Sequence, residues 1–181
     1  MTLLDSTLVG EAYSLPRPRV GDRVSLLILG VGNVLMGDEG VGVHVLRALE
    51  SGVYPAGVRL LDGGTAGIEL LGDIQRARAI VMIDATRDGR AAGTVTRLRP
   101  KSAAALPRGL SAHDFGIKDL FAAATLLEAM PVVHLFAISV ETINPMCLEL
   151  SPQVAASVSE VVKAVRLLVG EFEAACQFSG L

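Results

Sequence analysis

Four side chains that could take part in chemistry lie beside segments with an apolar or helical pattern. Glu39 belongs to the glycine-rich residues 30–42, and Asp62 and Asp84 each come directly after a run of apolar residues. His113 lies just before a stretch with helical periodicity. Two carboxylates and one imidazole form a ligand set that leaves coordination positions of a metal ion open. Glu39, Asp84 and His113 therefore predict a metal site, with Asp62 close to it.

Each of these residues also has a structural explanation when it is considered alone. Glu39 and its neighbour Asp38 stand where acids cap a helix and meet its dipole, an effect of about 0.3–1 kcal/mol each. Asp62 and Asp84 precede small residues and are typical of turns. A single loop histidine such as His113 is most often a surface residue. What favours a site is therefore the placement of these residues relative to one another.

That placement follows from the elements that the hydrophobic pattern predicts. Apolar runs at residues 24–31, 58–61, 79–83 and 132–140 predict buried strands, and 94–98 predicts a peripheral strand. Helical periodicity appears near residues 41–49, 68–71, 117–127 and 154–168. Strands that are apolar throughout and separated by helices predict an α/β fold, with a twisted, mostly parallel central sheet and helices on both faces. Such sheets carry their sites at the carboxyl ends of the strands.

Length and composition limit the functional classes. The 181 residues predict one domain, which we assign to residues 23–181, after a flexible N-terminal extension at residues 1–22. A net charge of −3 and 4% aromatic residues argue against nucleic acid as a partner. The apolar runs fall short of the ~18 residues that a membrane span needs. With no secretory pattern at the N-terminus and only two cysteines, we expect a cytoplasmic protein.

Other chemistries have weaker support. A dinucleotide-binding glycine motif would need glycine at position 35, which is Leu35. A nucleotide- or metabolite-binding module that uses the same loops stays open as the alternative function. The sequence lacks the Gly-x-Ser-x-Gly elbow of serine hydrolases. Cys147 is expected in the core, and His44 and His134 are expected to be structural.

The motifs together resemble those of the hydrogenase maturation endopeptidases. The resemblance rests on residues 30–33 followed by 38–42, on 61–67, on 83–85 and on His113, in that order. It extends from about residue 26 to the predicted closing helix, which is most of the chain. Four motifs in the same order make it specific.

The resemblance implies a function and a role for each candidate residue. Enzymes of this family remove a short C-terminal extension from the large-subunit precursor of a nickel-iron hydrogenase after nickel has been inserted. The positions that contact metal in the family match Glu39, Asp84 and His113, and Asp62 matches an acid that is also tied to function. The nickel is carried by the substrate and contacted in trans, and no organic cofactor is implied. Cleavage through a metal-polarised carbonyl and cleavage by an activated water both stay open.

Overall fold

The structure is a computed structural model that describes residues 24–107, 109–110, 117–127 and 130–178. The extension predicted for residues 1–22 and the candidate ligand His113 lie outside the described residues. None of the described helices combines the length and the apolar character needed to cross a membrane.

A five-stranded sheet forms the centre of the described part of the chain, in the order β2-β1-β3-β5-β4. Its strands are β1 (Val24–Val31), β2 (Val58–Gly64), β3 (Ala77–Thr86), β4 (Val95–Leu98) and β5 (Val132–Ser139). The pairings β1–β2, β1–β3 and β3–β5 are parallel, and β4 pairs antiparallel with β5 at the edge. The three central strands are almost entirely buried, as their continuous apolar sequences require. The predicted mostly parallel sheet is confirmed.

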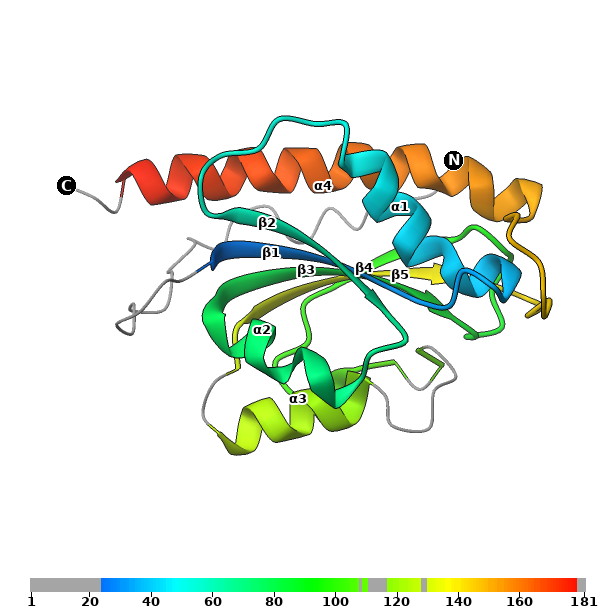
Figure 1. Cartoon of the computed structure of the whole chain (residues 1–181), viewed down its shortest axis with the longest axis horizontal. Coiled ribbons are helices and arrows are strands. Elements are labelled where there is room, and N and C mark those ends of the chain that lie inside the picture. The colour runs from blue at the N-terminus through cyan, green and yellow to red at the C-terminus, as the bar shows by residue number, and fades with distance from the viewer. Residues whose placement is uncertain (1–23, 108, 111–116, 128–129, 179–181) are drawn as a thin grey trace.

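Helices cover both faces of this sheet (Figure 1). On one face lie α1 (Val41–Leu49) and α4 (Pro152–Phe178), and on the other lie α2 (Leu71–Arg76) and α3 (Ile117–Leu126). Alternate residues of β1 point to opposite faces, so Leu26 and Ile28 join the core under α1 and α4. Leu27 and Leu29 join the second core, under α2 and α3. The predicted α/β class with two covered faces is therefore confirmed.

The strand order decides where a site can form. The chain leaves β1 toward β2 on one side, whereas β3 lies on the other side of β1, so the carboxyl ends of β1 and β3 flank a topological switch point. Glu39 follows β1, and Asp84 lies near the end of β3. Two of the predicted site residues thus reach the part of an α/β sheet where ligands bind.

Two strands are longer than predicted. The strand expected at residues 58–61 runs from Val58 to Gly64, so Asp62 lies within β2. The strand expected at residues 79–83 runs from Ala77 to Thr86, because Thr86 still pairs with Ser139 of β5. Asp84 therefore lies within the strand and does not open a turn, which makes the turn explanation for Asp84 wrong. The closing helix is also longer than predicted and spans Pro152–Phe178.

Candidate functional site

The loop after β1 brings Glu39 back over the end of its own strand. Glu39 lies in a short 3-10 turn, η2 (Gly37–Gly40), and is only 2% exposed. Its Oε2 accepts a hydrogen bond of 2.8 Å from the Asn33 amide. Gly32 has φ +131°, and a Cβ at this position would lie 2.0 Å from the Glu39 carbonyl oxygen. The tight fold of the loop, and with it the place of Glu39, therefore requires glycine at position 32.

The first helix is seated directly on the strand ends. A Cβ at Gly42 would lie 2.2 Å from the carbonyl oxygen of Val31 and 2.3 Å from that of Ile83. Both are backbone atoms, so no side chain larger than hydrogen fits without moving α1 away from β1 and β3. This close approach holds the turn that carries Glu39 at the boundary between the two strands.

Asp84 is the second candidate acid, and its side chain is fully buried at 0% exposure. It pairs in register with Ala137 of β5, and the next residue, Ala85, lines the same cavity as Glu39. Burying a carboxylate inside a sheet carries a desolvation cost that an apolar side chain would avoid. The position is therefore a poor choice for stability alone, and it supports a functional interpretation.

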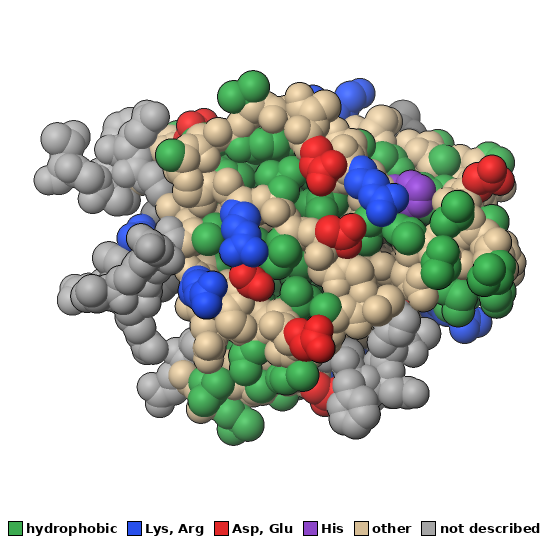
Figure 2. Space-filling model, in the orientation of Figure 1, with side chains coloured by type: hydrophobic (Ala, Val, Ile, Leu, Met, Phe, Trp, Pro, Cys, Tyr) green, Lys and Arg blue, Asp and Glu red, His purple; other side chains and the backbone are tan. Residues whose placement is uncertain are grey.

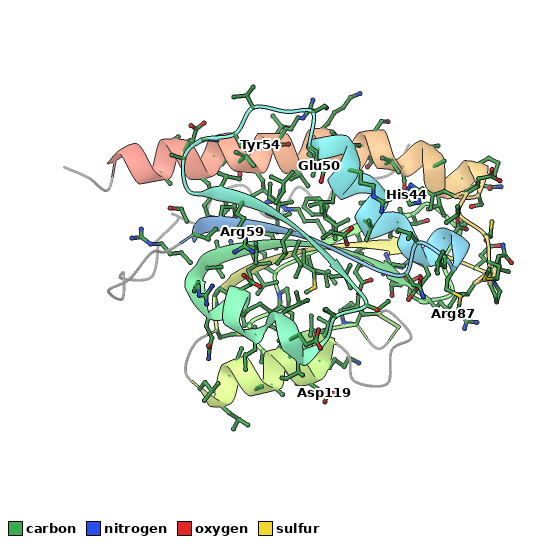
Figure 3. All side chains as sticks on the ribbon, in the orientation of Figure 1. His44, Glu50, Tyr54, Arg59, Arg87 and Asp119 are labelled. Atoms are coloured by element: carbon green, nitrogen blue, oxygen red, sulfur yellow. The ribbon has the colours of Figure 1, made fainter. Side chains whose placement is uncertain are left out.

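A cavity of about 680 Å³ opens at this end of the sheet. Glu39 and Glu141 contribute acidic groups to its wall, and Arg87 and Arg90 contribute basic ones. Arg87 follows β3, and Figure 3 shows it at the same end of the molecule as His44 of α1. A cavity of this size, with charges of both signs, is suited to a segment of peptide chain.

Asp62 lies at the same carboxyl end of the sheet but in a different environment. It is exposed, and it pairs in register with Gly30 of β1. Its Oδ1 accepts a hydrogen bond of 2.9 Å from the Gly64 amide, which is the contact of an aspartate-stabilised turn. Its Oδ2 lies 4.0 Å from Nη2 of Arg47 on α1. These contacts agree with the turn explanation and leave its functional role as a prediction.

Asp38 does not cap the helix that follows it, so the helix-cap explanation for Asp38 is wrong. No side-chain cap bond forms at η2 or α1. Instead its Oδ1 accepts a hydrogen bond of 2.6 Å from the Ser151 amide, immediately before α4. The two residues are 113 positions apart, so no local pattern could have shown this contact. Asp38, which is 4% exposed, fastens the loop after β5 to the loop after β1.

Cys147 was expected in the core, and this prediction is wrong. It is half-buried in the loop between β5 and α4, where its thiol lies 3.5 Å from the Glu149 carbonyl oxygen. Backbone pairing with Met36 holds it at the molecular surface rather than under a helix.

The two described histidines have different surroundings. His134 is buried in β5, as its apolar strand predicts, and its ring meets Phe172 of α4 edge to face. His44 lies on α1, where burial and the charge of Arg47 lower its pKa. The third predicted metal ligand, His113, is outside the described residues. Within the described ranges, no three His, Cys, Asp or Glu side chains are close enough together to hold a metal ion.

Comparison with known proteins identifies relatives across most of the chain. A family profile described as hydrogenase maturation protease matches residues 43–167. Hydrogenase 2 maturation protease of Escherichia coli strain K12 is 35% identical over 144 residues, which cover 77% of this chain and 87% of that protein. Hydrogenase expression/formation protein HupD of Rhodobacter capsulatus is 41% identical over 109 residues, 59% of this chain. The match spans only 52% of HupD, about half of its length.

Solved structures agree with the sequence relatives. The hydrogenase maturating endopeptidase HybD from Escherichia coli superposes with a TM-score of 0.75 at 34% identity, over 81% of this chain and 93% of that one. HybD from Thermococcus kodakarensis, a [NiFe] hydrogenase maturation protease, gives a TM-score of 0.65 at 30% identity. The match covers 80% of this chain and 99% of that one. The resemblance drawn from the motifs is thereby confirmed. With a matching profile, relatives and fold, this chain belongs to the hydrogenase maturation protease family.

Proposed function

We propose that this chain is an endopeptidase that removes the C-terminal extension of a nickel-iron hydrogenase large-subunit precursor after nickel insertion. Membership of the family supports the reaction class. The observation that carries the proposal to particular residues is the buried Glu39 on the wall of a peptide-sized cavity at the switch point of the sheet. We place the reaction in the cytoplasm, in keeping with a chain that has only two cysteines.

In this proposal, Glu39, Asp84 and His113 contact the nickel that the precursor carries. Oxygen and imidazole donors alone would hold nickel weakly, whereas cysteine thiolates of the precursor are softer ligands that nickel favours. The enzyme would then sense a metal that belongs to its substrate. Asp62, at the same edge of the sheet, is proposed to contribute to function as well, and no organic cofactor is needed.

The alternative, a nucleotide- or metabolite-binding module, has no observation in its favour. Phosphate groups bind where backbone amides at a helix N-terminus face the ligand without a competing negative charge. Here the turn before α1 buries two acids, Asp38 and Glu39, at that position. Their negative charge would repel a phosphate.

Purified protein incubated with nickel-loaded and nickel-free precursor tests the proposal. We expect only the nickel-loaded precursor to lose its C-terminal peptide. Mass spectrometry detects this loss. Glu39→Gln should abolish the reaction. Cys147→Ser is the control: it should stay active, because its thiol donates to the Glu149 carbonyl oxygen and Cys147 is not among the described residues that line the cavity. Cleavage of both precursor forms, or loss of activity in Cys147→Ser with its fold intact, would contradict the proposal.

A further inference from the structure

Two loops that are far apart in the sequence run side by side at the carboxyl end of the sheet. The Gly37 amide donates a hydrogen bond of 2.8 Å to the Cys147 carbonyl oxygen, and the Cys147 amide donates one of 3.2 Å to Leu35. Met36 and Cys147 form an isolated parallel bridge. The loop after β1 and the loop between β5 and α4 therefore form one structural unit.

This unit exposes large apolar side chains to solvent. Leu35 is 49% exposed, Met146 87% and Leu148 61%. We call these three residues the apolar patch. Figure 2 shows hydrophobic side chains gathered at the right-hand end of the molecule, over the segment that leads into α4. Met146 also has φ +62°, a backbone conformation that glycine adopts far more readily than methionine. An exposed apolar side chain held in that conformation has no evident benefit to the isolated fold.

The apolar patch is continuous with the candidate site. Ile143, on the same loop as Met146, lines the cavity together with Glu39. The Asn33 side chain accepts a hydrogen bond from the Leu35 amide, and the Asn33 amide donates to Glu39, so patch and site share one loop. The partly buried hydrogen bond from the Ser151 amide to Asp38 closes the unit on its other side. A protein that covers the patch is thereby held in a fixed position relative to the cavity.

We propose that the apolar patch is the docking surface for the folded body of the large-subunit precursor, whose C-terminal extension then enters the cavity beside Glu39. This inference rests on the proposed function and adds the surface that selects the substrate. An enzyme that cuts one bond of a folded protein gains selectivity from contacts outside the cavity, and exposed apolar patches are where such contacts form. Continuity between patch and cavity favours the precursor over other occupants.

The test compares matched pairs of exposed apolar residues. Met146→Ser combined with Leu148→Ser should raise the KM for nickel-loaded precursor roughly tenfold, with kcat unchanged, because contacts at an interface centre contribute on that scale. The control is Leu126→Ser combined with Leu167→Ser, on α3 and α4, where the side chains are 85% and 71% exposed. The control should leave KM unchanged. Met146→Gly is a further patch variant that suits the positive φ and protects the fold, and it should raise KM as well.

The outcomes separate this inference from the function on which it rests. Wild-type cleavage together with an unchanged KM in both patch variants would overturn the docking surface and leave the proposed function standing. A wild-type protein that cleaves no precursor would overturn both. If the patch variants change the sedimentation of the protein but not KM, a second copy of the chain occupies the patch, and the inference is wrong.

Discussion

Two neighbouring acidic residues, Asp38 and Glu39, have different places in the structure. Both are buried, and both accept a backbone hydrogen bond. Asp38 binds the Ser151 amide and joins two loops, but it is absent from the cavity wall that Glu39 lines. The geometry therefore assigns a structural role to Asp38, while Glu39 lines the cavity of the candidate site.

Neutralising each acid while keeping its shape should separate these roles. Asp38→Asn and Glu39→Gln both retain an oxygen that can accept the backbone bond, so each should change the unfolding free energy by less than about 1 kcal/mol. Asp38→Asn should keep most of the processing activity, whereas Glu39→Gln should lose it. Urea unfolding and precursor cleavage on the same preparations measure both. The assignment fails if Glu39→Gln stays near wild-type activity.

A second substitution at position 38 checks the structural role directly. Asp38→Ala leaves the partly buried Ser151 amide without its Asp38 acceptor, and it should lower the free energy of unfolding by about 1–3 kcal/mol. A value near zero would mean that the two loops do not depend on this bond.

At the residue scale, sequence patterns predict which acids form the candidate site, but not what each one contacts. Glu39 and Asp84 were predicted from their positions after apolar runs, and the strand order brings both to the same switch point. The contact of Asp38 with Ser151 was missed because it depends on tertiary packing. The core prediction for Cys147 is wrong, because the residue lies half-buried on a loop whose neighbouring residues Met146 and Leu148 are exposed.

At the element scale, β5 carries a buried histidine that links three elements. His134 packs edge to face against Phe172 of α4, with 5.8 Å between ring centroids. On β4, Nη2 of Arg97 lies 3.4 Å from Nδ1 of the ring, and since arginine only donates, Nδ1 must accept. A protonated ring could not accept this bond. Burial, and then the charges of Arg97 and Arg99, lower the pKa of His134 to about 3.

This lowered pKa predicts a pH-dependent stability. Below the ordinary value of 6.5, the unfolded chain binds a proton at His134 that the folded chain does not take up until pH falls to about 3. The contribution of the neutral His134 ring to the free energy of unfolding is therefore complete above pH 6.5. As the pH falls further, this contribution is lost at about 1.4 kcal/mol per pH unit. Between pH 7 and pH 5.5, wild type should lose about 1 kcal/mol more than His134→Gln in urea unfolding. Equal losses would show that the ring titrates normally.

The boundaries of helices and strands were predicted well where the hydrophobic pattern determines them. They were predicted poorly where hydrogen-bonded pairing with a neighbouring strand determines them. The helix at residues 117–127 and the edge strand at 94–98 match α3 and β4 to within a residue. The strand expected at residues 79–83 is longer than predicted, because Asp84, Ala85 and Thr86 continue the pairing with β5. A single sequence does not contain that pairing.

At the scale of the whole molecule, the fold follows from the alternation of apolar runs and helical segments, whereas the described residues alone form no complete metal site. The described residues bring two acids, Glu39 and Asp84, to one sheet edge and hold no group of three metal ligands. We propose that His113 supplies the third donor and the precursor the remainder. The enzyme would then bind nickel well only when the precursor presents it.

The isolated protein should accordingly hold metal weakly. Nickel analysis after extensive dialysis should find well under one equivalent per chain, because hard oxygen donors and a single imidazole compete poorly for nickel without thiolates. Zinc or cadmium in excess should still bind, since three donors leave room for water at an open site. Glu39→Gln should weaken that binding in calorimetry, while Asp38→Asn should not. If nickel stays bound through dialysis and is lost when His44 or His134 is substituted, the metal binds elsewhere. That result would contradict the proposal that enzyme and precursor each supply part of the nickel ligands.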